Sequence, residues 1–233
     1  MPKHMLKEID RVKKMVRALS DRVEDSVHRA VNAIERRDAA LAKKVIDNDI
    51  EIDHMEVDVE EECLKILALH QPVAQDLRFI VAVLKINSDL ERIADLAVNI
   101  AERAIFLSSQ EKLDIPFDFP GMADKAKEML EKSLEALFNL NSELARDVCA
   151  ADDEVDEINR QVYEKVKEGV AKHPERISSL LHFLSVSRHL ERIADHATNI
   201  AEDVIYMNDG DIVRHKAEVY KEDGGELTKG VVS

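Results

Sequence analysis

Acidic side chains recur at a four-residue spacing in this sequence of 233 residues. Because an α-helix turns once in about 3.6 residues, carboxylates at positions i and i+4 lie on one face and can share a cation. Carboxylate oxygens are suitable ligands for Mg²⁺, Ca²⁺, Mn²⁺ or iron. The candidate metal ligands are four pairs of such acids: Asp49 with Asp53, Glu91 with Asp95, Asp152 with Asp156, and Glu191 with Asp195. The spacing alone is also compatible with a solvated acidic face that binds no ion.

Further polar residues follow these pairs on the same helical stripes. They are secondary candidates for metal ligands: Asn99, Glu102, Asn199 and Glu202. A turn of about 100° per residue places the acidic stripes away from the apolar ones. We therefore expect the acids to face outward or obliquely outward.

The histidines and the missing motifs argue against an enzyme. His182, His189 and His196 are seven residues apart, which is about 10.5 Å of helix, so they cannot enclose one ion and are expected at a boundary between helices. Glu51 and His54 form the one ExxH motif, whereas a ferritin-like di-iron site needs two that face the bundle interior. The sequence contains no glycine-rich phosphate loop, no GxSxG motif and no Cys beside a His. No catalytic residues are predicted.

Long helices must position these side chains. Apolar residues spaced by three or four form one stripe from Ile9 to Ile34, which predicts a first helix. Asp38 is a suitable N-cap for a second helix that continues to about Leu69. A third helix is expected from about Val73 to Ser108.

The second half of the chain repeats the first. Residues 90–102 return as residues 190–202 with eleven of thirteen positions identical, and residues 49–53 return in modified form as residues 152–156. Asn141 stands where Asp38 stood. These repeats predict an all-α fold of two tandem three-helix bundles related by internal duplication, with six long helices. The expected boundaries are a first bundle over 1–110, a linker over 111–120, a second bundle over 121–209 and a polar tail, disordered at its end, over 210–233.

Composition limits the fold, the partners and the compartment. Six Gly and five Pro are too few for the turns of a β-rich fold, and 48 acidic against 33 basic residues give a net charge of −15. That charge disfavours nucleic acid and anionic lipid as partners. Cys63 and Cys149 form no CxxC motif and suit a reducing compartment, with Cys63 on the apolar side of its helix. The N-terminus lacks an apolar signal region, and the longest uncharged stretch, residues 177–187, is too short to span a bilayer. We expect a cytoplasmic protein without direct membrane insertion.

Several motifs resemble those of the PhoU family over about residues 5–215. They are Gln71–Arg78 (QPVAQDLR), the duplicated segments 90–102 and 190–202, and the C-terminal segments 205–207 and 211–215. The resemblance implies two three-helix bundles that form a homodimer, and metal clusters, of iron or zinc, on the paired acids given above. Asn159 and Tyr163 replace Glu56 and Glu60 of the first repeat, so the second site is expected to be poorer in carboxylates.

The same resemblance implies a function. Family members act as negative regulators of the phosphate-starvation response, coupling the phosphate ABC transporter to its sensor histidine kinase at the cytoplasmic face of the membrane. This protein would then be a metal-binding helical adapter that modulates phosphate uptake, and Arg78 and Arg188 are candidates for contacts with a partner. Two alternatives remain at this point: a carboxylate-bridged metal enzyme on a helical scaffold, and a metal-free structural adapter.

Overall fold

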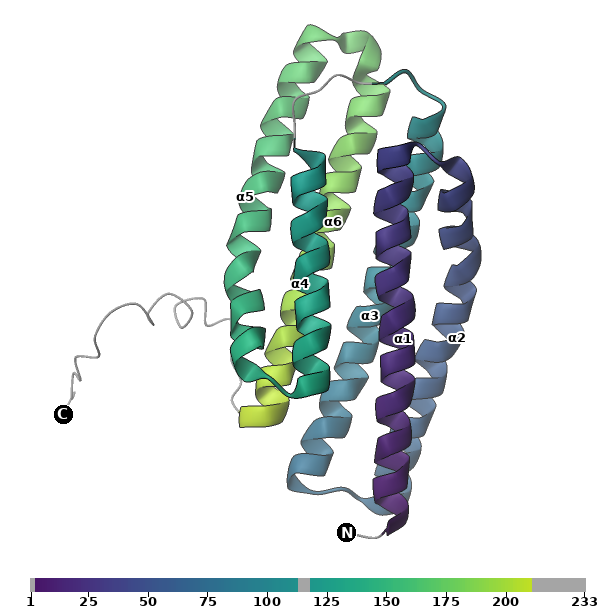
Figure 1. Cartoon of the computed structure of the whole chain (residues 1–233), viewed down its shortest axis with the longest axis vertical. Helices are drawn as coiled ribbons and strands as arrows, with labels where there is room; N and C mark the ends of the chain where they lie inside the picture. Colours follow the sequence, from purple (N-terminus) through teal and green to yellow (C-terminus); the bar gives the residue numbers. More distant parts are fainter. Residues whose placement is uncertain (1–2, 113–117, 211–233) are drawn as a thin grey trace, which may run out of the picture.

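Two three-helix bundles make up the protein in a computed structural model that describes residues 3–112 and 118–210 (Figure 1). The described residues form six long helices and one short 3₁₀ turn, with no strand, so the predicted all-α fold is confirmed. The elements are α1 (Lys3–Arg36), α2 (Ala39–His70), α3 (Ala74–Ser108), α4 (Phe119–Asn139), α5 (Ser142–Lys172), η1 (Pro174–Arg176) and α6 (Ile177–Asp209).

Capping residues define the starts of α2 and α5, as the sequence predicts. The Asp38 carboxylate accepts hydrogen bonds from the backbone N–H groups of Ala40 and Leu41, which otherwise lack helical partners. Asn141 plays the same part at the start of α5, where its side chain accepts from the N–H groups of Glu143 and Leu144. The equivalence of Asp38 and Asn141 in the two repeats is thereby confirmed.

The apolar stripes pack into the bundle interiors. Val12, Leu19, Val23 and Val27 on α1 are all fully buried, as their spacing requires. Cys63 on α2 is also fully buried, and burial raises the pKa of its thiol to about 12, so it is an inert core residue.

The bundles pack against each other through equivalent helices that run in opposite directions (Figure 1). Along the α3–α6 seam Lys85 lies near Asp203, Asp89 contacts His196, and Phe106 stacks on His182. In front of this seam α1 lies beside α4, which has 21 residues against the 34 of α1. The two halves of the chain therefore form one continuous core.

Two predicted segments fall partly outside the described residues. The predicted linker over 111–120 lies between the end of α3 at Ser108 and the start of α4 at Phe119, and residues 113–117 are outside the described part. Gly210, with a φ of 80°, ends α6 in the left-handed conformation that glycine adopts without strain. The rest of the predicted tail, 211–233, also lies outside the described residues.

Candidate functional site

Four carboxylates from α2 and α3 meet on one side of the first bundle, and we call them the first acidic cluster: Asp49, Asp53, Glu91 and Asp95. The pKa of Asp49 is raised to about 6, first by burial and then by the charges of Asp53, Asp95 and Glu91 in that order. Burial also raises the pKa of Glu91, with Asp95 as the next cause. The two acid pairs predicted from spacing on separate helices thus lie close enough to repel each other.

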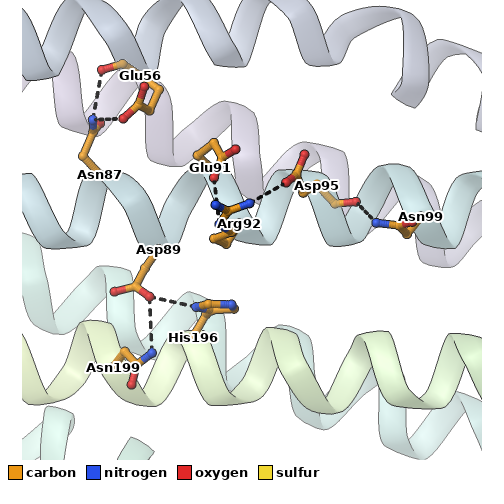
Figure 2. Close-up of polar contacts among 9 residues, drawn as sticks. All are labelled: Glu56, Asn87, Asp89, Glu91, Arg92, Asp95, Asn99, His196 and Asn199. Atoms are coloured by element: carbon orange, nitrogen blue, oxygen red, sulfur yellow. Dashed lines mark hydrogen bonds and ion pairs between the residues drawn. The ribbon is translucent and has the colours of Figure 1, made fainter.

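Glu56 extends this cluster along α2. Its pKa is raised by burial, then by Glu60 and Glu91. The buried amide of Asn87 on α3 donates hydrogen bonds of 2.9 Å to both the carboxylate and the backbone carbonyl of Glu56 (Figure 2). Sequence reasoning did not include Asn87, although a lone amide among apolar neighbours on α3 was visible in the sequence.

The second acidic cluster consists of Asp152 and Asp156 from α5 with Glu191 and Asp195 from α6. The pKa of Asp152 is raised to about 6, with burial as the largest cause and the Asp195 charge as the second. The Thr198 hydroxyl donates a 3.2 Å hydrogen bond to Asp152, and this bond lowers the pKa of Asp152 against the larger effect of burial. Burial is the largest cause of the raised pKa of Glu191 and of Asp195 as well. The structure brings together all four predicted residues.

Few cations offset this concentration of negative charge. Arg92 lies 3.4 Å from Glu91 and 3.3 Å from Asp95, but its side chain is 57% exposed and hence largely hydrated. In the first cluster one oxygen of Asp49, Oδ1, is buried and has no hydrogen-bond partner among the described residues. An unpaired buried carboxylate oxygen is costly, and a bound cation would satisfy it. The donor set therefore fits a hard or borderline metal ion.

The secondary candidates are engaged in other contacts. Asn99 donates a 2.7 Å hydrogen bond to the backbone carbonyl of Asp95, and Glu102 pairs with Arg103 at 2.8 Å. Asn199 donates to Asp89 across the seam between the bundles at 3.3 Å. Glu202 is half-buried on α6. These four residues lie on the predicted stripes, one or two turns beyond the paired acids.

A polar bridge lies between the two clusters. His196 Nδ1 is 2.8 Å from Asp89 Oδ1, and Asn199 contacts the same oxygen (Figure 2). The charge of His196 lowers the pKa values of both Glu91 and Asp195, against their larger upward shifts. Figure 2 shows Asp89 pointing from α3 toward α6. Sequence reasoning missed Asp89, because a single acid without a partner at i+4 looks like any surface residue.

His182 and His189 lie on the same side of α6 as His196, since the three residues are spaced by seven. The His182 ring stacks on Phe106 of α3 with centroids 3.8 Å apart. The pKa of His189 is lowered to about 4, first by burial and then by the charges of Arg103, Arg192 and Arg188, so His189 is neutral at pH 7. The expectation that these residues serve packing between helices is confirmed for His182 and His196.

The ExxH motif does not form an inward-facing metal site. Glu51 is exposed and pairs with Arg22 of α1 at 2.9 Å, and His54 is exposed as well. In a ferritin-like di-iron site, by contrast, the ligands project into the bundle interior.

The two predicted arginine contacts differ in accessibility. Arg78 is half-buried at the start of α3, and its Nε is buried without a hydrogen-bond partner among the described residues. Its guanidinium lies against Gly210, where a Cβ would come within 3.1 Å of Nη1. Arg188 is exposed on α6, close enough to Glu191 to lower its pKa against the larger effect of burial. Arg188 is therefore the more accessible of the two.

Six helices in two tandem units, each with an acidic cluster on its second and third helices, define a duplicated helical-bundle protein. The family model for the PhoU domain matches twice, at residues 16–104 and 119–204. The chain therefore belongs to the PhoU family. A relative from Aquifex aeolicus, named a phosphate-specific transport system accessory protein PhoU homolog, is 39% identical over 91% of this chain and 96% of its own length.

Solved structures agree with this assignment. The crystal structure of PhoU from Pseudomonas aeruginosa superposes with a TM-score of 0.85 at 36% identity, covering 88% of this chain and 99% of that one. The phosphate transport system regulatory protein PhoU from Streptococcus pneumoniae gives a TM-score of 0.80 at 28% identity, covering 90% and 99%. Within the described residues, no helix combines the length and the apolar character needed to cross a bilayer.

Proposed function

We propose that this protein is an accessory adapter of phosphate transport that acts as a negative regulator of the phosphate-starvation response. The observation that carries the proposal is the pair of PhoU domains, which together occupy most of the chain. The Aquifex aeolicus relative is named a transport system accessory protein, and the Streptococcus pneumoniae protein is titled a regulatory protein of phosphate transport. In this function the protein contacts both the phosphate ABC transporter and its sensor histidine kinase in the cytoplasm, and modulates phosphate uptake.

The proposed function needs surfaces rather than catalytic chemistry. Long, uninterrupted helices give rigid faces on which side chains keep a fixed spacing, and rigid faces lower the entropy cost of docking. Arg188 on the exposed side of α6 is a candidate contact for an acidic partner surface. We propose that the protein works as a non-enzymatic homodimer.

We also propose that each acidic cluster binds metal, with iron or zinc as the expected ion. The support is the convergence of four carboxylates in each cluster and the unpaired buried oxygen of Asp49. A bound ion supplies positive charge that removes the repulsion between the acids and so rigidifies the helix pair. The helix faces that contact the partner proteins would then keep a fixed position relative to each other.

The adapter proposal is tested by measuring binding to its two partners. Metal-loaded protein, chelator-treated protein and the variant E91Q/D95N/E191Q/D195N are each titrated onto the cytoplasmic part of the sensor kinase and onto the transporter in detergent. We expect tight binding by the metal-loaded form and weaker binding by the other two. The control variant D47N/E61Q/E143Q/D147N removes the same number of exposed acids from α2 and α5 and should bind like wild type.

Two outcomes would contradict specific parts of the proposal. Unchanged kinase binding after complete removal of metal would refute the role of the metal. Failure of the metal-loaded protein to bind either partner would refute the adapter function itself, as would a gene deletion that leaves a phosphate-starvation reporter silent in rich phosphate.

A further inference from the structure

A third group of metal-ligating side chains lies away from both acidic clusters. Glu24 and His28 on α1 and Glu131 on α4 each bring one ligand atom to a common point, and these atoms lie within 4.8 Å of one another. Glu24 and His28 belong to the first bundle, and Glu131 belongs to the second. Neither repeat alone contains the group, and it has no counterpart among the paired acids.

The fold explains why these residues meet. Glu24 and His28 are separated by one helical turn and so project from the same face of α1. α4 lies beside α1 in the opposite direction, which brings Glu131 to that face (Figure 1). His28 Nε2 is 3.0 Å from Glu131 Oε1, and the two side chains are 36% and 48% exposed. The group is thus at the surface but fixed by two packed helices.

The group of Glu24, His28 and Glu131 carries negative charge that a bound cation would neutralise. With His28 neutral, two carboxylates share the space, and within the described part of the chain no Lys or Arg forms an ion pair with either of them. Burial raises the pKa of Glu24, and the Glu131 charge is the second cause. A protonated His28 could pair with Glu131, but this ion pair leaves Glu24 without a direct partner.

An adjoining groove leaves room for water ligands. It has a volume of about 370 Å³ and runs between α1 and α4. Asp21 and Glu135 line it together with Glu24 and Glu131. Among the described residues that form its wall the one cationic side chain is Arg17, whose guanidinium lies 3.8 Å from the centre of the Phe138 ring. A cation entering the groove would therefore meet predominantly negative charge and open space on one side of the three ligands.

We propose that Glu24, His28 and Glu131 bind one zinc ion at the junction of the two bundles. One imidazole and two carboxylates are borderline ligands that suit Zn²⁺, which takes three protein ligands and keeps water in an open fourth position. The imidazole distinguishes this site from the acidic clusters, where the donors are oxygens. Zinc at this place would tie α1 to α4 and so fix the orientation of one bundle relative to the other.

The test measures zinc bound by the full chain. Zinc stoichiometry is determined by equilibrium dialysis and mass spectrometry for wild type, H28A and E24Q/E131Q, each checked for helicity by circular dichroism. The same substitutions are repeated in the E91Q/D95N/E191Q/D195N background, so that binding at the acidic clusters does not obscure the result. Co²⁺ is used as a second probe, because its visible absorption reports ligation by nitrogen and a low coordination number.

The expected result is the loss of one zinc per chain, or a weakening of at least about 10-fold, in both H28A and E24Q/E131Q, since disturbing even an outer-shell partner of a metal costs this much. The matched control D21N/E135Q removes two acids from the same groove without touching the three ligands, and should keep the zinc. The proposal is overturned if H28A binds zinc and Co²⁺ like wild type. It is also overturned if the D21N/E135Q variant loses as much zinc as E24Q/E131Q, because binding would then reflect the acidity of the groove alone.

Discussion

Asp49 and Asp152 occupy equivalent positions in the two repeats, and each has a pKa of about 6 in the folded protein because it is partly buried among other carboxylates. In the unfolded chain an Asp titrates near pH 3.9. Between about pH 4 and pH 6 these two carboxyl groups are therefore more protonated in the folded state than in the unfolded state. It follows that the stability contributed by these groups is present below about pH 4 and is lost as the pH rises through about 6.

Replacing Asp49 by Asn should stabilise the metal-free protein at pH 8 and leave it unchanged near pH 3.5. The expected gain is on the order of 1 kcal/mol once solvent screening at this half-buried position is allowed for. The measurement is the difference in free energy of unfolding between variant and wild type from pH 3.5 to pH 8. Asp47→Asn, at an exposed position of the same helix, is the control, and its effect on the free energy of unfolding should be much smaller than that of Asp49→Asn. A flat profile for Asp49→Asn would contradict the electrostatic cost assigned to the cluster.

Bound metal should offset the electrostatic repulsion between the carboxylates of each acidic cluster. An ion that binds the folded state alone stabilises it by about 2.7 kcal/mol at a concentration 100 times its dissociation constant. We therefore expect zinc or ferrous iron to raise the melting temperature of wild type. The increase should be much smaller in E91Q/D95N/E191Q/D195N, and a melting temperature insensitive to both ions would count against the metal sites.

At the scale of elements, the seam between α3 and α6 joins the two bundles. Leu96 follows Asp89 by seven residues and therefore lies on the same face of α3, toward α6, where it is almost fully buried. Its counterpart in the second repeat is His196, which contacts Asp89. The seam thus contains both an apolar contact at Leu96 and a polar contact between Asp89 and His196.

Leu96→Ala should lower the free energy of unfolding by about 2–5 kcal/mol, because it leaves a cavity where two helices meet. Chemical denaturation monitored by circular dichroism measures the loss. The control is Leu64→Ala, at a position on α2 that is 51% exposed, where the same change should have little effect. Equal losses for the two variants would show that the seam contributes little to stability.

The starts of α2 and α5 and the buried faces of the helices could be predicted from the sequence because their causes are local. Asp38 and Asn141 cap helices through backbone groups two and three residues away, and apolar spacing along each helix fixes its buried face. The same spacing predicted the paired acids of each cluster. By contrast, the sequence did not reveal Asp89 or Glu131 as contacts between bundles. Which helices become neighbours across two bundles depends on how whole faces fit together, and no local spacing encodes it.

At the scale of the whole molecule, the two acidic clusters are similar but not equal. Glu56 and Glu60 lie one and two turns beyond Asp53 in the first repeat, whereas the second repeat has Asn159 and Tyr163 in their places. Asn159 accepts a 3.0 Å hydrogen bond from the Ser187 hydroxyl. The first bundle therefore offers more carboxylate oxygens to a cation.

This difference predicts two classes of metal binding in one titration. The tighter class should disappear in E91Q/D95N, and the weaker class in E191Q/D195N. Isothermal titration with Mn²⁺, an ion that favours oxygen ligands, separates the two. Identical affinities in both double variants would show that the additional acids of the first bundle do not take part.

The antiparallel contact of α3 with α6 has a consequence for the history of the chain. Two copies of one segment that pack antiparallel, each presenting the same face, form the isologous contact of a two-fold homodimer. This chain has the architecture of such a dimer with its subunits joined by a covalent tether. Once joined, the copies no longer have to remain identical. His196 can then face Asp89 in one half while Leu96 stays apolar in the other, and each half is free to specialise.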